Sequence, residues 1–293
     1  MTRRRPSLQA ISENPTLCPL AFAVVTERFS GLKWHSHADS PDSSQAFVLS
    51  AFIPLLTFAD KDAIIEQFVA SMFPTIPPRA DRSWDITPEY TNRELLGETG
   101  AGMPTNIDML LTADDVVICV ESKFRVDALE GFGKCGQATS GECRGFHGAG
   151  SDAKNGTDAS CRLDVQDRRR DPRKYWEVAR GHFRDEVFAE QTSSQVCPFR
   201  DTHQLLRNYL TASAFAETEE KSHFGTVGIV PRARTKAIFE GVDKFRALLL
   251  PEDAERVAAV NYEDYIAVLD EGSDDAKALA GFLRGLLPES GVH

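Results

Sequence analysis

Two short apolar segments joined by a pair of aspartates are the feature that most constrains how this chain folds. Residues 107–112 (IDMLLT) and 116–124 (VVICVESKF) are rich in Val, Ile and Leu and are separated by Ala-Asp-Asp. Such segments predict β-strands, and a two-residue loop made by Asp114 and Asp115 would join them as a β-hairpin. The chain must therefore bury a sheet around this hairpin.

The length of the loop also fixes which residues face each other. If Ala113 pairs with Val116, the same antiparallel register places Asp108 opposite Glu121. Residues that face each other in this way have Cβ atoms roughly 5 Å apart. The sequence therefore predicts that two carboxylates are brought together in an otherwise apolar hairpin.

A lysine joins these carboxylates on the same face. Side chains alternate across a strand, so Val117, Cys119, Glu121 and Lys123 point to one side. Adjacent carboxylates repel each other, and a divalent cation relieves that repulsion. A nearby lysine can orient a water or stabilise charge on a phosphate. The alternative is an ordinary surface ion pair between Glu121 and Lys123, with Asp108 solvated.

The segments NID108MLL and VE121SK123F resemble the signature of the PD-(D/E)XK nuclease superfamily, which includes restriction endonucleases and recombination nucleases. The likeness covers roughly residues 60–125. It implies a mixed central β-sheet flanked by helices and metal-dependent phosphodiester hydrolysis. It also implies that Asp108 and Glu121 bind Mg²⁺ or Mn²⁺ and that Lys123 is catalytic. The sequence departs from the signature in that Pro104 lies four residues before the aspartate rather than directly before it.

The resemblance also suggests further site residues. Members of the superfamily often supply another acid from the helix before the sheet, and Glu66 is the candidate here, with Glu94 and Glu98 as competitors. Glu66 lies at the margin of the apolar stripe of its helix, so a solvated glutamate is an equal alternative.

A helix after the sheet carries a glutamine and a tyrosine in some members of the superfamily. Gln204, Arg207 and Tyr209 are therefore candidates for substrate binding. The solvated face of an amphipathic helix is the alternative for them.

A local basic segment lies in an acidic chain. The formal net charge is −11, which would repel a phosphate backbone if it were spread evenly. Residues 162–184, however, hold eight Lys or Arg against four Asp or Glu, with aromatic residues interleaved. Arg173 and Lys174 are candidates for DNA binding, while Tyr175 and Trp176 stack on the substrate or anchor the helix. A solvated helical face is the alternative.

Four cysteines bracket a long irregular segment that is rich in Gly and Ser. Cys135, Cys143, Cys161 and Cys197 could hold a zinc ion or an iron–sulfur cluster, although no pair has the tight spacing of common metal motifs. Reduced cysteines that pack as small apolar groups are the alternative.

Other segments give weaker expectations. Residues from 45 to 73 predict two helices broken near Pro54, and Asn92 to Leu96 predict a strand. Helices are expected at 203–217, 234–250 and 274–287, and strands at 224–231 and 261–270. We expect an α/β fold of restriction-endonuclease-like type: a partly flexible extension over 1–42, then one domain over 43–290 with an insertion at about 130–165.

The composition is that of an ordinary globular protein, with 42% hydrophobic and 26% charged residues. No apolar run is long enough to span a membrane and no secretion signal is present, so we expect a cytoplasmic protein. The sequence thus predicts a metal-dependent nuclease that acts on DNA, and a homodimer and a role in restriction or anti-phage defence are further expectations. A catalytically silent nucleic-acid-binding module and a protein-interaction domain are the alternatives.

Overall fold

A computed structural model gives the fold of the chain. It describes residues 5–99, 104–124, 132–133, 135, 163, 173–188 and 197–288. Most of the predicted insertion at 130–165 lies outside the described residues. The predicted division into an extension and one domain is not tested and stays a prediction.

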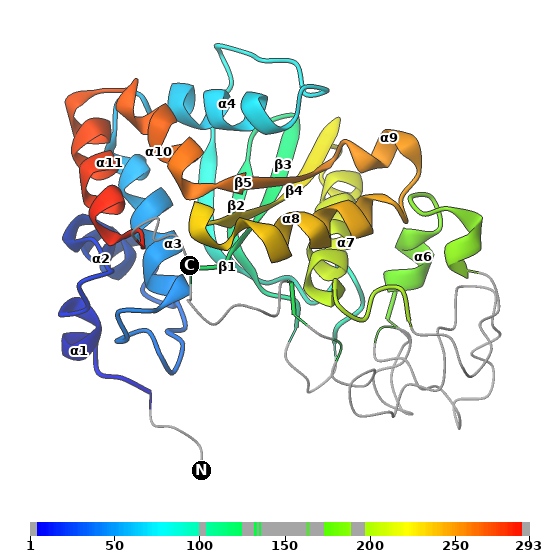
Figure 1. Ribbon diagram of the computed structural model, residues 1–293, viewed down its shortest axis with the longest axis horizontal. Helices are drawn as coiled ribbons and strands as arrows, with labels where there is room; N and C mark the ends of the chain where they lie inside the picture. Colours follow the sequence, from blue (N-terminus) through cyan, green and yellow to red (C-terminus); the bar gives the residue numbers. More distant parts are fainter. Residues whose placement is uncertain are drawn as a thin grey trace.

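A five-stranded mixed sheet forms the centre of the molecule (Figure 1). Its strands, in both chain and spatial order, are β1 (Asp85–Tyr90), β2 (Ile107–Thr112), β3 (Val116–Ser122), β4 (His223–Val230) and β5 (Val257–Asn261). The pairs β1–β2 and β2–β3 are antiparallel, whereas β3–β4 and β4–β5 are parallel. The sheet therefore changes direction at β3, the strand that carries Glu121.

Burial on both faces explains the composition of β3. Every residue of the strand is buried, as expected for a central strand with a continuous apolar sequence. Val116, Ile118 and Val120 pack into the core on one side, and Val117 and Cys119 pack into the core on the other. Glu121 follows the second set by alternation, so it faces the second core.

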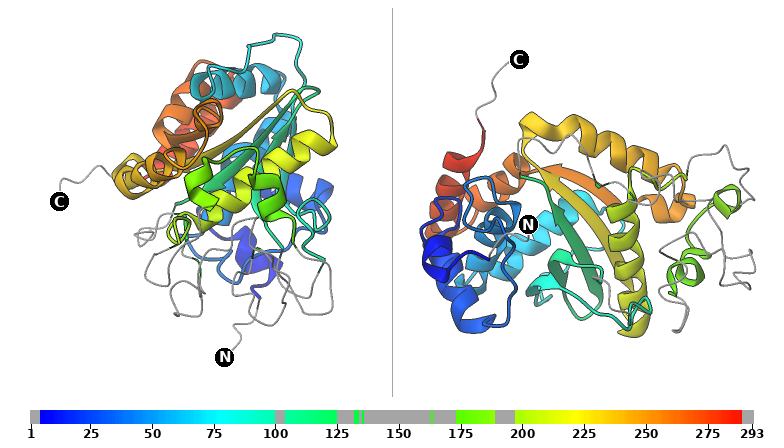
Figure 2. Two further views of the ribbon diagram at one scale, coloured as in Figure 1. Left: turned by 90° about the vertical axis from the view of Figure 1, so that its right-hand side faces the viewer. Right: turned by 90° about the horizontal axis from the view of Figure 1, so that it is seen from below.

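Helices cover the two faces of the sheet (Figure 2). The helices of the first core are α2, α3, α4, α10 and α11, at Pro19–Arg28, Ser44–Phe52, Lys61–Met72, Tyr262–Asp270 and Asp274–Leu286. Short elements on the same side are α1 (Leu8–Ser12) and a 3₁₀ turn, η1 (Ile53–Thr57). The prediction of two helices broken near Pro54 is confirmed, because Pro54 lies in η1 between α3 and α4.

The second core lies under α6 (Tyr175–Ala179), α7 (His203–Thr218) and α8 (Thr235–Arg246). The short elements η2 (Asp185–Phe188), η3 (Arg232–Arg234) and α9 (Pro251–Ala254) complete this part of the chain. Helix α7 packs on β3 and β4 and is the element that faces Glu121. The predicted α/β fold, a mixed sheet flanked by helices, is confirmed.

Two of the predicted strands are wrong. The segment expected as a strand at 92–96 overlaps a turn at residues 93–97, and the strand of that region is β1, several residues earlier. Residues 262–270 form α10 rather than a strand, because Asn261 and Asp264 make a reciprocal capping box that starts a helix. The last strand is β5, which ends at Asn261.

None of the helices in the described ranges combines the length and the apolar character needed to cross a membrane.

Candidate active site

The β2–β3 hairpin has the predicted register. Met109 pairs with Val120, and continuing the ladder by one residue places Asp108 opposite Glu121. The backbone N–H of Ala113 donates to the carbonyl of Val116 at 2.9 Å, which closes the two-residue loop. The predicted proximity of the two carboxylates therefore follows from the strand pairing.

Lys123 lies directly after β3 and is fixed to the neighbouring strand. Its backbone N–H donates to the carbonyl of Ile229 on β4 at 2.9 Å. Its ammonium Nζ donates to Glu121 Oε1 at 2.7 Å. The lysine side chain is 19% exposed and that of Glu121 is 1% exposed, so the ion pair lies at the wall of the site rather than on an open surface.

Two amide side chains from α7 complete this arrangement. Gln204 accepts from Lys123 Nζ at 2.8 Å through Oε1 and donates to Glu121 Oε1 at 2.5 Å through Nε2. Asn208 lies one helical turn further and donates to Glu121 Oε2 at 2.8 Å. Both oxygens of the buried carboxylate are thus held. Asn208 was missed from the sequence, although its i+4 spacing from Gln204 could have identified it.

Asp108 is held by the backbone next to Glu121. The N–H of Ser122 donates to Asp108 Oδ2 at 2.8 Å. Removal from water raises the pKa of Asp108 well above its usual range, and the like charge of Glu121 raises it further, while Lys123 opposes this shift. Burial and the like charge of Glu121 therefore disfavour the charged form of Asp108 until a positive group compensates them.

The pKa of Lys123 is raised by the same groups. Burial pulls it down, but the negative charges of Glu121 and Asp108 and the hydrogen bond to Glu121 outweigh that effect. The ammonium form is therefore the form that the site stabilises. Such a group suits the stabilisation of negative charge that grows on a phosphate.

Glu89 and His35 also lie at this centre and were missed from the sequence. Glu89 falls between the β1 residues Pro88 and Tyr90, which pair with Met109 and Ile107, so it faces Asp108. The negative charge of Glu89 contributes to the raised pKa of Asp108. The imidazole Nε2 of His35 lies 3.2 Å from Glu89 Oε2.

The structure does not bring Glu66 to this centre. Its Oε1 accepts from Arg82 Nη1 at 2.6 Å and from the backbone N–H of Arg79 at 2.7 Å. Its Oε2 accepts from Trp84 Nε1 at 3.0 Å. Arg82 also donates to Asp115 in the hairpin loop, at 2.9 and 3.0 Å. The loop lies at the opposite end of the hairpin from Glu121, so Glu66 belongs to a separate, structural ion-pair cluster.

Glu98 and Arg207 form a second buried network with groups around α6. Glu98 accepts from the backbone N–H of Thr105 at 2.7 Å and from the Tyr175 hydroxyl at 2.8 Å. Arg207 donates to Thr105 Oγ1 at 2.9 Å and pairs with Glu98 at 3.4 Å. Arg173 lies 3.9 Å from the same carboxylate oxygen. Arg207 and Arg173 therefore support a buried glutamate, and their predicted contacts with substrate stay a prediction.

The other candidates lie in different surroundings. Tyr209 is fully buried among aromatic rings of the second core, so the structure does not bring it to the centre. Glu94 and Lys174 are exposed. Tyr175 and Trp176 are buried, as expected if they anchor the helix below.

The cysteine prediction falls largely outside the described residues. Cys143 and Cys161 lie there, whereas Cys135 and Cys197 are described and partly buried. The backbone N–H of Cys135 donates to the carbonyl of Arg200, which places it near the segment that holds Cys197. A zinc or iron–sulfur site stays a prediction.

The donor groups at the hairpin suit magnesium. Within the described part of the chain, no three His, Cys, Asp or Glu side chains come together as a complete metal cage. Magnesium, however, is commonly held by one or two carboxylates together with waters and substrate phosphates. Asp108 and Glu121 provide such a pair. Asn208 Oδ1 is buried beside them and has no hydrogen-bond partner among the described residues, so it offers a further neutral acceptor.

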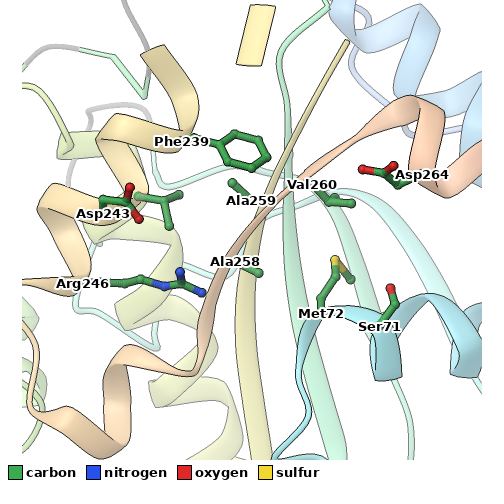
Figure 3. A pocket seen from close by; sticks show the side chains of 10 residues that line it. Ser71, Met72, Phe239, Asp243, Arg246, Ala258, Ala259, Val260 and Asp264 are labelled. Carbon is green, nitrogen blue, oxygen red and sulfur yellow. The ribbon is translucent and has the colours of Figure 1, made fainter. Parts of the chain in front are cut away.

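A cavity of about 420 Å³ lies elsewhere, between α4, α8 and the outer strand β5 (Figure 3). Met72, Phe239 and Val260 are among the residues that line it, and Asp243 and Arg246 lie at its wall. None of the residues at the hairpin centre lines this cavity. The candidate active site is therefore defined by its charged side chains and not by the cavity.

One of the comparisons with known proteins identifies a family. A search of curated proteins and a search of solved structures each find no match. A family model described as "Restriction Endonuclease associating with ARP" matches residues 9–284, which is nearly the whole chain. The chain therefore belongs to this restriction endonuclease family.

Proposed function

We propose that this protein is a nuclease that hydrolyses DNA phosphodiester bonds with a divalent cation, Mg²⁺ or Mn²⁺. The observation that carries the proposal is the group formed by Asp108, Glu121 and Lys123 at the open end of one hairpin. Its lysine and glutamate are joined by Gln204 from a separate helix. Membership of a restriction endonuclease family supports the same reaction class.

Each side chain has a role that follows from its charge and position. Asp108 and Glu121 would hold the cation, since they are the two carboxylates that the strand register brings together. When bound, a divalent cation polarises the phosphodiester and makes a nearby water more acidic. Lys123 would orient the attacking water or stabilise the charge that develops on the phosphate. Gln204 and Asn208 keep the carboxylate and the ammonium in one geometry.

The family description also suggests a cellular role and a partner for the protein. We infer that the protein acts in restriction or anti-phage defence, because the family is described as a restriction endonuclease. The same description names an association with ARP, and a partner of that kind is proposed for this chain as well. A homodimer stays a prediction.

The test is cleavage of supercoiled plasmid and of linear single-stranded DNA with magnesium, with manganese and with a chelator. The full chain is compared with Lys123→Ala, and Lys277→Ala is the matched control because Lys277 is an exposed lysine on α11. We expect metal-dependent cutting by the wild-type chain and by the control, and a loss on the order of 10²- to 10³-fold in Lys123→Ala.

Two outcomes would contradict the proposal. Equal cutting by the wild-type chain and Lys123→Ala would show that the activity comes from another site or from a contaminant. Binding of DNA without cutting under any metal condition would identify a catalytically silent binding module instead.

A further inference from the structure

Glu89 has a strained backbone next to the proposed catalytic centre. Its φ is 51°, in the left-handed region that glutamate rarely adopts. It lies in β1 between Pro88 and Tyr90, both of which pair with β2, and so faces Asp108. Strain of this kind persists only where the surrounding structure holds it in place, and it is common at functional sites.

Three side chains hold the Glu89 carboxylate. Gln45 Nε2 donates to Oε1 at 2.8 Å, and Asn106 Nδ2 donates to Oε2. His35 Nε2 lies 3.2 Å from the same Oε2, and only 9% of the Glu89 side chain is exposed. Both oxygens of the Glu89 carboxylate are therefore engaged by neighbouring side chains. Its position suits it to orient His35.

The loop that carries His35 is fixed from two sides. Gln45 Oε1 accepts from the backbone N–H of His35 at 2.8 Å, and Gln45 Nε2 donates to the carbonyl of Lys33 at 3.1 Å. Gln45 lies in the first turn of α3, and its neighbour Ser44 accepts from the backbone N–H of Phe124, just past Lys123. The loop is therefore tied to the strand end that carries the catalytic lysine.

The imidazole itself remains accessible, with 52% of the His35 side chain exposed. The hydrogen bond to Glu89 raises its pKa, burial opposes this shift, and the negative charges of Glu89 and Glu121 add to the rise. These two carboxylates are the charged groups of the described chain that act on His35. The imidazolium form is thus stabilised at the rim of a centre dominated by carboxylates.

The positive charge of the His35 imidazolium matters for the binding of a negatively charged substrate at this acidic centre. Asp108, Glu121 and Glu89 bring three carboxyl groups to this centre, and Lys123 is already paired with Glu121, so a further positive group would favour the phosphate that a nuclease must bind. We propose that His35, held by Glu89, is a contact for a phosphate of the nucleic-acid substrate. This inference rests on the proposed nuclease function and adds a substrate-binding residue to it.

The test is the binding of a short fluorescein-labelled DNA duplex to the full chain, measured by fluorescence anisotropy with calcium in place of magnesium, at pH 6 and pH 8. We expect the wild-type chain to bind more tightly at pH 6, where the imidazole is protonated. His35→Asn should lose several-fold affinity at pH 6 and most of the difference between the two pH values. Its slope of log affinity against log salt should fall by roughly 0.9, the value for one phosphate contact.

Two further variants separate this role from a loss of structure. His37→Asn changes an exposed histidine of the same loop and should behave as the wild-type chain. Glu89→Gln keeps the size of the side chain but removes its charge, so the pH at which binding weakens should move down. Thermal melting of each variant shows whether it is folded.

The possible failures are distinguishable. If the wild-type chain cuts DNA with metal but His35→Asn keeps its affinity and salt slope at pH 6, His35 is not a phosphate contact and only this inference fails. If the wild-type chain neither cuts nor binds DNA, the proposed function fails and this inference fails with it.

Discussion

The two ends of the β2–β3 hairpin both carry buried charge but balance it differently. At the loop, Arg82 is fully buried and lies between Glu66 and Asp115, and Arg79 adds a second guanidinium that contacts Asp115. At the open end, Asp108, Glu121 and Glu89 face Lys123 and a histidine. At the loop, the buried carboxylates are matched by arginines. At the open end, the acidic side chains outnumber the basic ones. A folded protein tolerates an excess of acidic side chains when a ligand supplies positive charge. The excess at the open end therefore distinguishes a binding site from the structural ion-pair cluster at the loop.

The largest effect is expected from removing charge at the open end. Glu121→Gln keeps the shape of the side chain but removes a proposed cation ligand and the partner of Lys123. We expect cleavage to fall by at least about 10²- to 10³-fold at a temperature where thermal melting shows that the variant is folded. Glu66→Gln is the matched change at the other end, and it should lower stability while cleavage at low temperature is kept. A reversal of these two results would remove the distinction between the ends.

Breaking the balanced cluster should mainly affect folding. Arg82→Leu leaves Glu66 and Asp115 without their buried partner and should cost on the order of 3 kcal/mol of unfolding free energy. Urea denaturation measures this loss. The control is Arg284→Leu, since the pair of Arg284 with Asp270 is solvent-exposed and should contribute less than about 1 kcal/mol. Equal losses in the two variants would mean that the cluster is no more important than a surface pair.

A smaller effect is expected from the residue that positions Lys123. Gln204→Ala removes hydrogen bonds to both Lys123 and Glu121 while leaving the charges in place. Cleavage should fall by about 10- to 100-fold, as is usual for groups that orient a metal ligand. Gln67→Ala, a change at an exposed glutamine on α4, is the control. Full activity in Gln204→Ala would show that Lys123 needs no support from α7.

The smallest effect concerns the pH dependence of stability at the loop. The hydrogen bonds from Arg82 lower the pKa of Asp115 to about 2. A lowered pKa gives stability that is complete above the pKa of the unfolded chain, near 4, and is lost as the pH falls toward 2. Asp115→Asn should therefore lose less stability than the wild-type chain between pH 4 and pH 2 in thermal melts. An unchanged acid profile would contradict this assignment.

The sequence predicted the hairpin well because its constraints are local. A two-residue loop between two apolar strands leaves one register, and that register alone brings Asp108 and Glu121 together. Gln204 was predicted from the likeness of its helix to a helix of the nuclease superfamily, and its side chain contacts both Lys123 and Glu121. The reaction class and the general fold could be inferred from these residues together with their likeness to a known signature.

The parts that could not be predicted depend on long-range contacts. No local sequence pattern predicts that Glu66 pairs with Arg82, or that Glu89 takes a left-handed backbone conformation opposite Asp108. The error at 261–270 was avoidable, however. Tyr262, Tyr265, Ile266 and Leu269 are buried at helical spacing, and Asn261 with Asp264 marks a helix start, but the aromatic and β-branched composition favoured a strand.

Gln204 and Asn208, the two amide side chains of α7, determine when the candidate active site can form during synthesis. Asp108, Glu121 and Lys123 lie close together in the chain, but Gln204 and Asn208 follow roughly 80 residues later. During synthesis the hairpin leaves the ribosome well before α7. Glu121 and Lys123 therefore lack their hydrogen bonds with Gln204 and Asn208 until that helix docks. A nascent or truncated chain that ends before α7 would carry the complete signature and yet lack an ordered centre. In this way the order of synthesis would delay the proposed activity until most of the chain has folded.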